Sequence, residues 1–168
     1  MRNVILILIL IILNNSYVFS QTSEQFLENG IEKGDMNDFR GAIANFSKAI
    51  EINPDYKDAY FLRGFTKFKL KDYRGVIADL NKVIDLDPKY KKAYYYRALS
   101  KSSIENYNGA IADLNELIDL DPRHKDAYFH SGIVKYKTGK EHQGCLDLSK
   151  AGELGHDKAY EVIRKFCN

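Results

Sequence analysis

The sequence contains none of the short motifs that most often identify an enzyme. It has no glycine-rich phosphate loop, no HExxH zinc motif and no GxSxG nucleophile motif. Its aspartate and glutamate residues recur along the chain without a distinguished pair, and they are better explained as a solvated outer face. We therefore predict that the protein is not an enzyme and that it has no catalytic residues, no cofactor and no metal ligands.

An excess of charge of either sign is also missing. Lysine and arginine together number 25 and aspartate and glutamate 23, which leaves a formal net charge of +2. Nucleic-acid binding requires a basic face that displaces counterions from phosphates, so we expect no nucleic-acid partner. Tryptophan is absent, but 12 tyrosines and nine phenylalanines are too many aromatic residues for a disordered chain. The length of 168 residues suits one globular domain.

Long apolar runs are absent after the first residues of the chain. Arg2 precedes ten apolar residues, Val4–Leu13, and the polar residues Asn14–Ser16 follow. As a helix, such a run spans about 15 Å, roughly half of the hydrocarbon layer of a membrane. This layout is typical of a secretory signal peptide, which we predict over residues 1–20, with a mature chain of residues 21–168. We expect an exported protein, periplasmic or secreted, without stable membrane insertion after cleavage; a retained anchor is the alternative.

Proline is scarce, and its three copies reveal an internal repeat. Pro54, Pro88 and Pro122 are each 34 residues apart, within the segments EINPDYKDAYF, DLDPKYKKAYY and DLDPRHKDAYF. A second block recurs in step with them, as DFRGAIANFSKAI, DYRGVIADLNKVI and NYNGAIADLNELI. A gap-free match over three copies indicates repeated structural units, each of which packs on its neighbours.

This period and pattern resemble the tetratricopeptide repeat (TPR), in which a helix, a tight turn, a second helix and a proline recur. The resemblance extends to a fourth copy, where His156 stands in place of the proline. It implies an all-α fold: a right-handed superhelix of four helix-turn-helix repeats plus a C-terminal capping helix, as in small exported bacterial-type TPR proteins. The repeats are expected at about 23–56, 57–90, 91–124 and 125–158, and the capping helix at 157–167. The paired helices are expected at 23–33 and 39–52, 56–70 and 73–86, 90–104 and 107–120, and 124–138 and 141–153.

Two arginines depart from the family pattern. Arg63 and Arg97 occupy a repeat position that is often leucine in the family. In an antiparallel hairpin they lie at about the height of Asp79 and Asp113 on the facing helix. The first copy has asparagine at both positions, so the arginine occurs only where the aspartate does. We therefore predict an interhelical ion pair in the second and third repeats.

The run Tyr94-Tyr95-Tyr96 raises the question of where three successive aromatic rings can point. Consecutive residues of a helix are about 100° apart, so the run spreads over more than half of the circumference. By the resemblance, Tyr94 packs inside its hairpin and Tyr95 faces the concave groove. Tyr96 falls on a third face, at the boundary between adjacent repeats.

In TPR proteins the first helix of each repeat lines the concave groove, and here its groove positions are mostly apolar or aromatic. Large exposed apolar surfaces typically mark interaction sites, so we expect a scaffold that binds a protein or peptide segment in this groove. The hydrophobic residues exclude the Lys/Asn/Arg clamp with which some family members hold a C-terminal carboxylate. The alternatives are a subunit that self-associates as a homo-oligomer or assembles in a cell-envelope complex, and a stripe that is partly core. The expected groove residues are Leu27, Ile31, Phe61, Phe65, Phe68, Tyr95, Leu99, Phe129, Ile133 and Tyr136.

Cysteine is limited to Cys145 and Cys167. In an antiparallel pair formed by the last repeat helix and the capping helix, the two lie at about the same height. An even cysteine count in an exported chain favours a disulfide, and we predict the Cys145–Cys167 bond. Free buried thiols are an alternative, and a redox or metal site that includes His142 is a remote one. His156 lies too far along the helix axis to join such a site.

Overall fold

The computed structural model describes residues 22–167. The predicted signal peptide, residues 1–20, lies outside the described residues, and so does Asn168. The described part consists of nine α-helices without a strand, which confirms the all-α prediction. No helix between residues 22 and 167 has the length and apolar character needed to cross a membrane.

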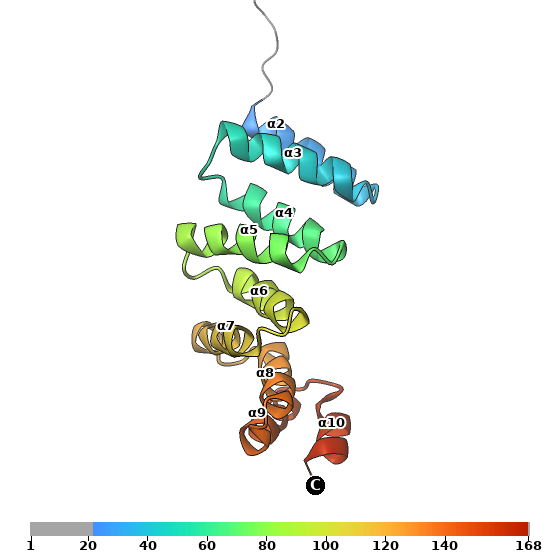
Figure 1. The fold of residues 1–168 in the computed structure, drawn as a ribbon, viewed down its shortest axis with the longest axis vertical. Helices are drawn as coiled ribbons and strands as arrows, with labels where there is room; N and C mark the ends of the chain where they lie inside the picture. Colours follow the sequence, from blue (N-terminus) through green and yellow to red (C-terminus); the bar gives the residue numbers. More distant parts are fainter. Residues whose placement is uncertain (1–21, 168) are drawn as a thin grey trace, which may run out of the picture.

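The helices form four antiparallel hairpins that stack one after another, followed by one short helix (Figure 1). Each helix packs against the next one along the described chain. The observed bounds differ from the predicted ones by no more than two residues. The hairpins are α2 (Ser23–Asp35) with α3 (Phe39–Ile52), α4 (Lys57–Lys69) with α5 (Tyr73–Leu86), α6 (Lys91–Ser103) with α7 (Tyr107–Leu120), and α8 (Lys125–Lys137) with α9 (Glu141–Glu153); the capping helix is α10 (Ala159–Phe166).

The turn inside each of the first three hairpins is built in the same way. It contains one residue with left-handed backbone, namely Asn37, Lys71 or Glu105, with φ of 61°, 62° and 62°. The next residue caps the second helix, as Asp72 does by accepting a hydrogen bond from the N–H of Gly75 at 3.0 Å. A Cβ atom at Gly75 would collide with the Asp72 carboxylate. The cap therefore accounts for the glycine that recurs at this position of the repeat.

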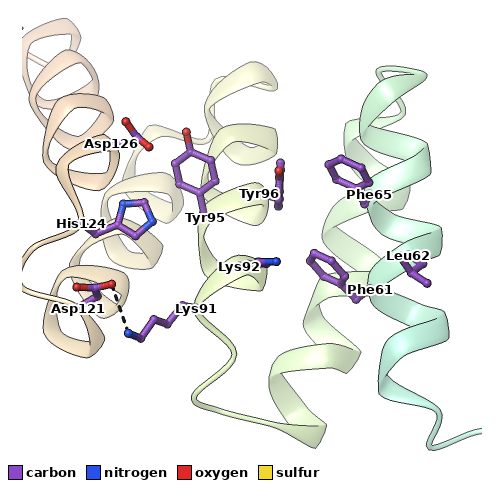
Figure 2. Close-up of a pocket in the computed structure, with 10 residues that line it drawn as sticks. All are labelled: Phe61, Leu62, Phe65, Lys91, Lys92, Tyr95, Tyr96, Asp121, His124 and Asp126. Atoms are coloured by element: carbon purple, nitrogen blue, oxygen red, sulfur yellow. Dashed lines mark hydrogen bonds and ion pairs between the residues drawn. The ribbon is translucent and has the colours of Figure 1, made fainter. Parts of the chain in front are cut away.

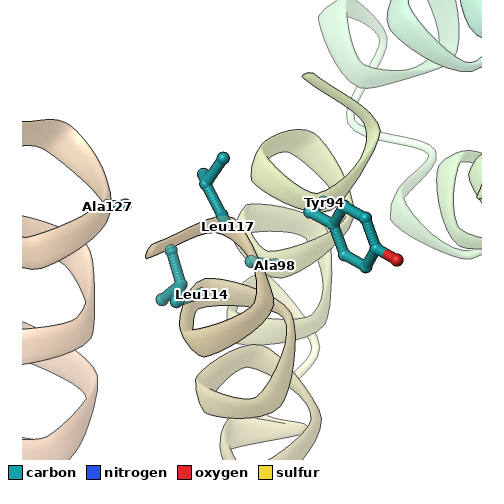
Figure 3. Packing of buried hydrophobic residues seen from close by; sticks show 5 residues of the cluster. All are labelled: Tyr94, Ala98, Leu114, Leu117 and Ala127. Carbon is teal, nitrogen blue, oxygen red and sulfur yellow. The ribbon is translucent and has the colours of Figure 1, made fainter. Parts of the chain in front are cut away.

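Small and branched apolar side chains fill the space within and between the hairpins. In the third repeat, Tyr94, Ala98, Leu114 and Leu117 form a buried cluster that Ala127 of the next repeat completes (Figure 3). Tyr94 is 7% exposed, and its hydroxyl donates a hydrogen bond to a backbone carbonyl at 3.1 Å. The first tyrosine of the run is thus an internal packing residue, as predicted.

A buried charge cluster connects the second repeat to the first. Asp79 is 3% exposed and accepts hydrogen bonds from Arg63 Nε at 3.0 Å and Nη2 at 2.6 Å, which confirms the predicted pair. Lys67 donates to the same carboxylate at 2.8 Å. Arg63 Nη1 also donates to Ser47 of the preceding repeat at 3.1 Å. The second cation and the link across the repeat boundary go beyond the prediction.

The same arrangement recurs in the third repeat and, with one replacement, in the fourth. Asp113 accepts from Arg97 Nη2 at 2.6 Å and pairs with Lys101 at 2.8 Å, so the second predicted pair is also confirmed. In the fourth repeat, Asp147 binds Lys135 at 2.6 Å, and a serine donates to it in place of the arginine. In each of these three hairpins, a carboxylate of the second helix is therefore neutralised by one or two cations of the first helix, and in the fourth repeat a hydroxyl group adds a hydrogen bond.

The capping helix α10 is held by contacts at both of its ends. Cys145 of α9 and Cys167 form a disulfide, with their Cα atoms 5.8 Å apart. The ring of Phe166 lies 5.1 Å from that of Tyr136 on α8. At the other end, Lys125 donates to a backbone carbonyl of the turn between α9 and α10 at 3.0 Å. Because both cysteines are in the bond, neither serves as a metal ligand.

Candidate functional site: an aromatic hollow between the first helices

An open hollow of about 520 Å³ lies between α4 and α6, the first helices of the second and third repeats (Figure 2). Phe61 and Phe65 project into it from α4, because residues four apart share one face of a helix. Tyr95 and Tyr96 line it from α6, and Figure 2 shows Tyr96 directed toward the two phenylalanines. The segment that leads into α8 borders the hollow beside Tyr95. Two repeats and the start of a third thus contribute to one aromatic surface.

Tyr96 is the central ring of this surface. Its centroid lies 5.1 Å from Phe65, 5.3 Å from Phe68 and 5.4 Å from Tyr95, and each pair meets edge to face. Such contacts stabilise a cluster beyond simple burial, so they hold the wall of the hollow in one arrangement. Tyr96 does lie at the boundary between two repeats, as expected, and it also lines the hollow, which the groove assignment left out. The available signal was its repeat position, where Leu62 of the previous repeat lines the hollow as well.

The hydroxyl groups in the hollow remain protonated over the physiological range. Burial raises the pKa of Tyr95 to about 12, and the negative charge of Asp126 adds to the shift. Burial also raises the pKa of Tyr96. Both phenols can therefore donate hydrogen bonds to a ligand while their rings provide apolar surface.

Charged groups surround the rings. Lys91 donates to Asp121 at 3.3 Å, so these two charges are already paired (Figure 2). Lys92 has no ion-pair partner among residues 22–167, and Figure 2 shows it beside Phe61. The hollow combines an apolar interior with a polar border, which is the common composition of a protein-interaction site.

The predicted groove residues of the fourth repeat lie in two other places. Phe129 lines a hollow of about 380 Å³, and its ring stacks on that of His156 at 3.9 Å. Ile133 and Tyr136 line a hollow of about 340 Å³ together with Phe166 of the capping helix. The cap therefore stands against the fourth repeat where a further repeat would otherwise continue the stack.

The remaining predicted groove residues are distributed between cores and surface. Leu27 packs against the buried cluster between the first and second repeats. Ile31 is 41% exposed and lines a smaller hollow of about 120 Å³ together with Phe65. Phe68 lies edge-on to Tyr73 and Tyr96, and Leu99 is half-buried outside the hollows described above. Of the ten predicted residues, the 520 Å³ hollow contains Phe61, Phe65 and Tyr95.

The side chains that line the 520 Å³ hollow suit ligand binding better than covalent catalysis. They supply aromatic rings, phenol donors, one imidazole and charged groups at the border. Within residues 22–167, no group of three or more His, Cys, Asp or Glu side chains is arranged to hold a metal ion.

Comparison with protein families gives matches over the first three repeats. A model described as TPR repeat matches residues 35–71, and a model described as Tetratricopeptide repeat matches residues 57–90 and 91–124. Among curated proteins, the uncharacterized protein MJ0572 of Methanocaldococcus jannaschii is 44% identical over 39 residues. That alignment covers 23% of this chain and 45% of the relative, so the chain matches less than half of that protein's length.

Solved structures with the same fold cover most of the chain. MamA of Desulfovibrio magneticus RS-1 is similar with a TM-score of 0.75 at 23% identity, over 79% of this chain and 75% of that one. YrrB, described as a TPR protein with an unusual peptide-binding site, is similar with a TM-score of 0.79 at 17% identity, over 84% and 74% of the two chains. At these identities the likeness shows the fold alone.

Proposed function

The chain belongs to the tetratricopeptide repeat family, and we propose on this basis that it is a non-enzymatic interaction module. Its aromatic hollow between α4 and α6 holds an apolar segment of a partner protein. The observation that carries this proposal is the hollow itself: about 520 Å³ of open space walled by four aromatic rings from two repeats. Rigid aromatic side chains provide a large contact area at a low cost in conformational entropy.

The chemistry of the walls favours a partner segment with bulky aliphatic or aromatic side chains. Phe61, Phe65, Tyr95 and Tyr96 are half-buried, so each ring keeps a surface that a ligand can cover. The nearest ion pair, Lys91 with Asp121, is already satisfied within the chain. Affinity is therefore expected to come from apolar burial, with the phenol hydroxyls setting orientation. The peptide-binding site named for YrrB is consistent with this use of the fold but belongs to that protein.

A binding experiment with matched variants tests the proposal. Peptides are selected from a random phage-displayed library on the purified protein, and their affinities are measured by isothermal titration calorimetry. The double variant Phe61→Ala/Phe65→Ala is expected to bind at least about tenfold more weakly, which corresponds to about 1.4 kcal/mol. Leu146→Ala is the control, since Leu146 lies on α9, is 57% exposed and lines none of the hollows. Equal affinity of a folded double variant for the selected peptides would exclude the hollow as the binding site.

A second candidate is that another copy of this chain supplies the apolar segment. Apolar side chains are exposed at both ends of the stack: Met36 is 65% exposed in the first repeat, and Tyr160 is 54% exposed in the cap. Light scattering over a concentration series separates the two candidates. A protein that remains monomeric at high concentration excludes the homo-oligomer.

We further propose that the protein is exported and that residues 1–20 are removed as a signal peptide. The bond between Cys145 and Cys167 supports this proposal, because disulfides persist in oxidising compartments. Mass spectrometry of the protein from its native cell, without reduction, tests both points. A chain that retains residues 1–20 and carries two free thiols would refute the export proposal.

A further inference from the structure

Three of the four histidines gather where the fourth repeat meets its neighbours. They occupy repeat positions that hold other residues in the third repeat. His124 precedes α8, His130 lies on α8, and His156 lies in the turn before the capping helix. The corresponding residues of the third repeat are Tyr90, Tyr96 and Pro122.

The three imidazoles are connected through two aromatic rings. His124 and His130 lie 5.5 and 5.7 Å from the ring of Tyr95. Phe129 lies 5.5 Å from His130 on one side and stacks on His156 at 3.9 Å. Tyr95 borders both the 520 Å³ hollow and the 380 Å³ hollow, so this histidine cluster belongs to the wall of the proposed binding site.

His124 and His156 each hold Nδ1 where an added proton would find no acceptor. Nδ1 of His124 accepts a hydrogen bond from the N–H of Ala127 at 3.2 Å and thereby caps α8, which a protonated Nδ1 cannot do. Nδ1 of His156 is buried and has no hydrogen-bond partner among the described residues, whereas Nε2 lies 3.5 Å from Asp126. Full protonation of His156 would bury an N–H group that no neighbouring residue accepts.

His130 resists protonation because of its surroundings. Burial lowers its pKa, and the neighbouring His156 and His124 act in the same direction, while Asp126 opposes them. A histidine with a lowered pKa binds fewer protons in the folded state than in the unfolded state. Its contribution to stability is therefore present at neutral pH and is lost as the pH falls below the ordinary value of about 6.5.

The charged groups around the cluster are nearly balanced in number. Lys125, Asp126, Asp157 and Lys158 line the 380 Å³ hollow from α8 and from the turn before α10. On the side of α6, Tyr95 is uncharged, and Lys91, Lys92 and Asp121 line the other hollow together with His124. Lys91 already pairs with Asp121. Protonation of three histidines would therefore add positive charge without an equal number of unpaired carboxylates to receive it.

We propose that this histidine cluster is a pH-sensitive contact that loosens the wall at Tyr95 and the turn before the cap as the pH falls from about 7.5 to about 5.5. The loosening follows from the geometry and does not depend on any ligand. Its consequence, weaker binding of an apolar segment at low pH, rests on the proposed function. Acidic conditions would then release the partner.

Thermal unfolding at the two pH values tests the contact itself. The variant His124→Tyr/His130→Tyr/His156→Gln replaces all three imidazoles, and the two tyrosines are the residues that the third repeat has at these positions. Proline is avoided at position 156, because the N–H of His156 donates to Ala151 at 2.9 Å. His142→Gln, on the exposed side of α9, is the control.

The unmodified protein and the control are expected to lose at least about 3 °C more in melting temperature between these pH values than the triple variant. An equal loss in all three proteins would overturn the proposal. If the triple variant does not fold, an NMR titration of the histidine rings in the unmodified protein decides instead. A His130 ring that titrates at or above about 6.5 would overturn the proposal, and one that titrates below it would support it.

Titration with a peptide selected on the hollow separates this inference from the proposed function. Affinity that decreases severalfold at the lower pH in the unmodified protein, but not in the triple variant, supports the release mechanism. Binding that is independent of pH contradicts the release mechanism while leaving the hollow as a binding site. If selection yields no peptide that binds the hollow at either pH, this result counts against the proposed function. The thermal test still decides the inference about the histidine cluster.

Discussion

Replacement of Asp113 by asparagine tests the charge cluster that ties the third repeat together. The carboxylate is 4% exposed, and it receives Arg97 at 2.6 Å and Lys101 at 2.8 Å, whose side chains are 14% and 16% exposed. Asp113→Asn keeps the shape of the side chain but leaves two cations without a counter-ion between packed helices. Removal of one partner of a buried ion pair costs about 3–5 kcal/mol, and the partial exposure of the cations places the expected loss near 3 kcal/mol.

Urea unfolding followed by circular dichroism measures this loss of free energy, with an exposed pair as the control. Asp55 lies 3.2 Å from Lys82, but the two side chains are 75% and 37% exposed. Asp55→Asn is therefore expected to change the free energy of unfolding by no more than about 1 kcal/mol. A loss below about 1 kcal/mol for Asp113→Asn would show that water reaches the cluster and that the burial argument is wrong.

The first repeat supplies the design for a second step. It has asparagines in place of the arginine and the aspartate, at Asn29 and Asn45, and it keeps the lysine. The double variant Arg97→Asn/Asp113→Asn copies this arrangement. It is expected to be at least about 1.5 kcal/mol more stable than the sum of the two single losses predicts, because the second change removes an uncompensated cation. Strict additivity would mean that the two residues do not interact.

Three further predictions concern the turns, the cap and the hollow. Lys71→Gly and Glu105→Gly remove the steric cost of a side chain at a backbone φ of 62°. Each is expected to stabilise the protein by up to about 1 kcal/mol in urea unfolding. Destabilisation would contradict the left-handed backbone at these positions. Cys145→Ser/Cys167→Ser removes the disulfide between residues 22 apart in sequence and is expected to lower the free energy of unfolding by about 3 kcal/mol. Hydrogen exchange is expected to become faster in α10 only. Unchanged exchange in α10 would show that packing alone holds the cap. Because the pKa of Tyr95 is raised to about 12, its contribution to stability is complete below pH 10 and is lost as the pH rises toward 12. Ultraviolet titration is therefore expected to show one tyrosine that ionises late and that Tyr95→Phe removes. If Tyr95→Phe leaves that late component in place, the assignment to Tyr95 is wrong.

The fold could be predicted almost completely from the period of the sequence. The 34-residue recurrence of proline and of the two sequence blocks gives the repeat boundaries, and the resemblance to the TPR family implies the helical hairpin in each repeat. The Arg63–Asp79 and Arg97–Asp113 pairs follow from the same reasoning, since their spacing is set within one hairpin. The lysines that join these pairs, Lys67 and Lys101, were not part of the prediction.

The candidate site could be predicted only in part. The repeat register places Phe61, Phe65 and Tyr95 on the first helices, and these three do lie in one hollow. It also places Tyr96 at the boundary between repeats, but it does not reveal that this ring lines the same hollow, because that contact depends on the tilt between neighbouring hairpins. Nor does it reveal that Tyr136 meets the capping helix rather than a continuous groove.

The sequence by itself determined the architecture of this protein: helical hairpins of fixed length, their order, and the charge pairs within them. These are local properties, governed by residues that lie within one repeat of each other. Only the tertiary structure decided how the groove is divided, which rings face open space, and that three histidines from separate positions meet around Tyr95 and Phe129. Contacts across repeats depend on the angle at which each hairpin packs on the next and on where the cap ends the stack, and a 34-residue period carries no information about either.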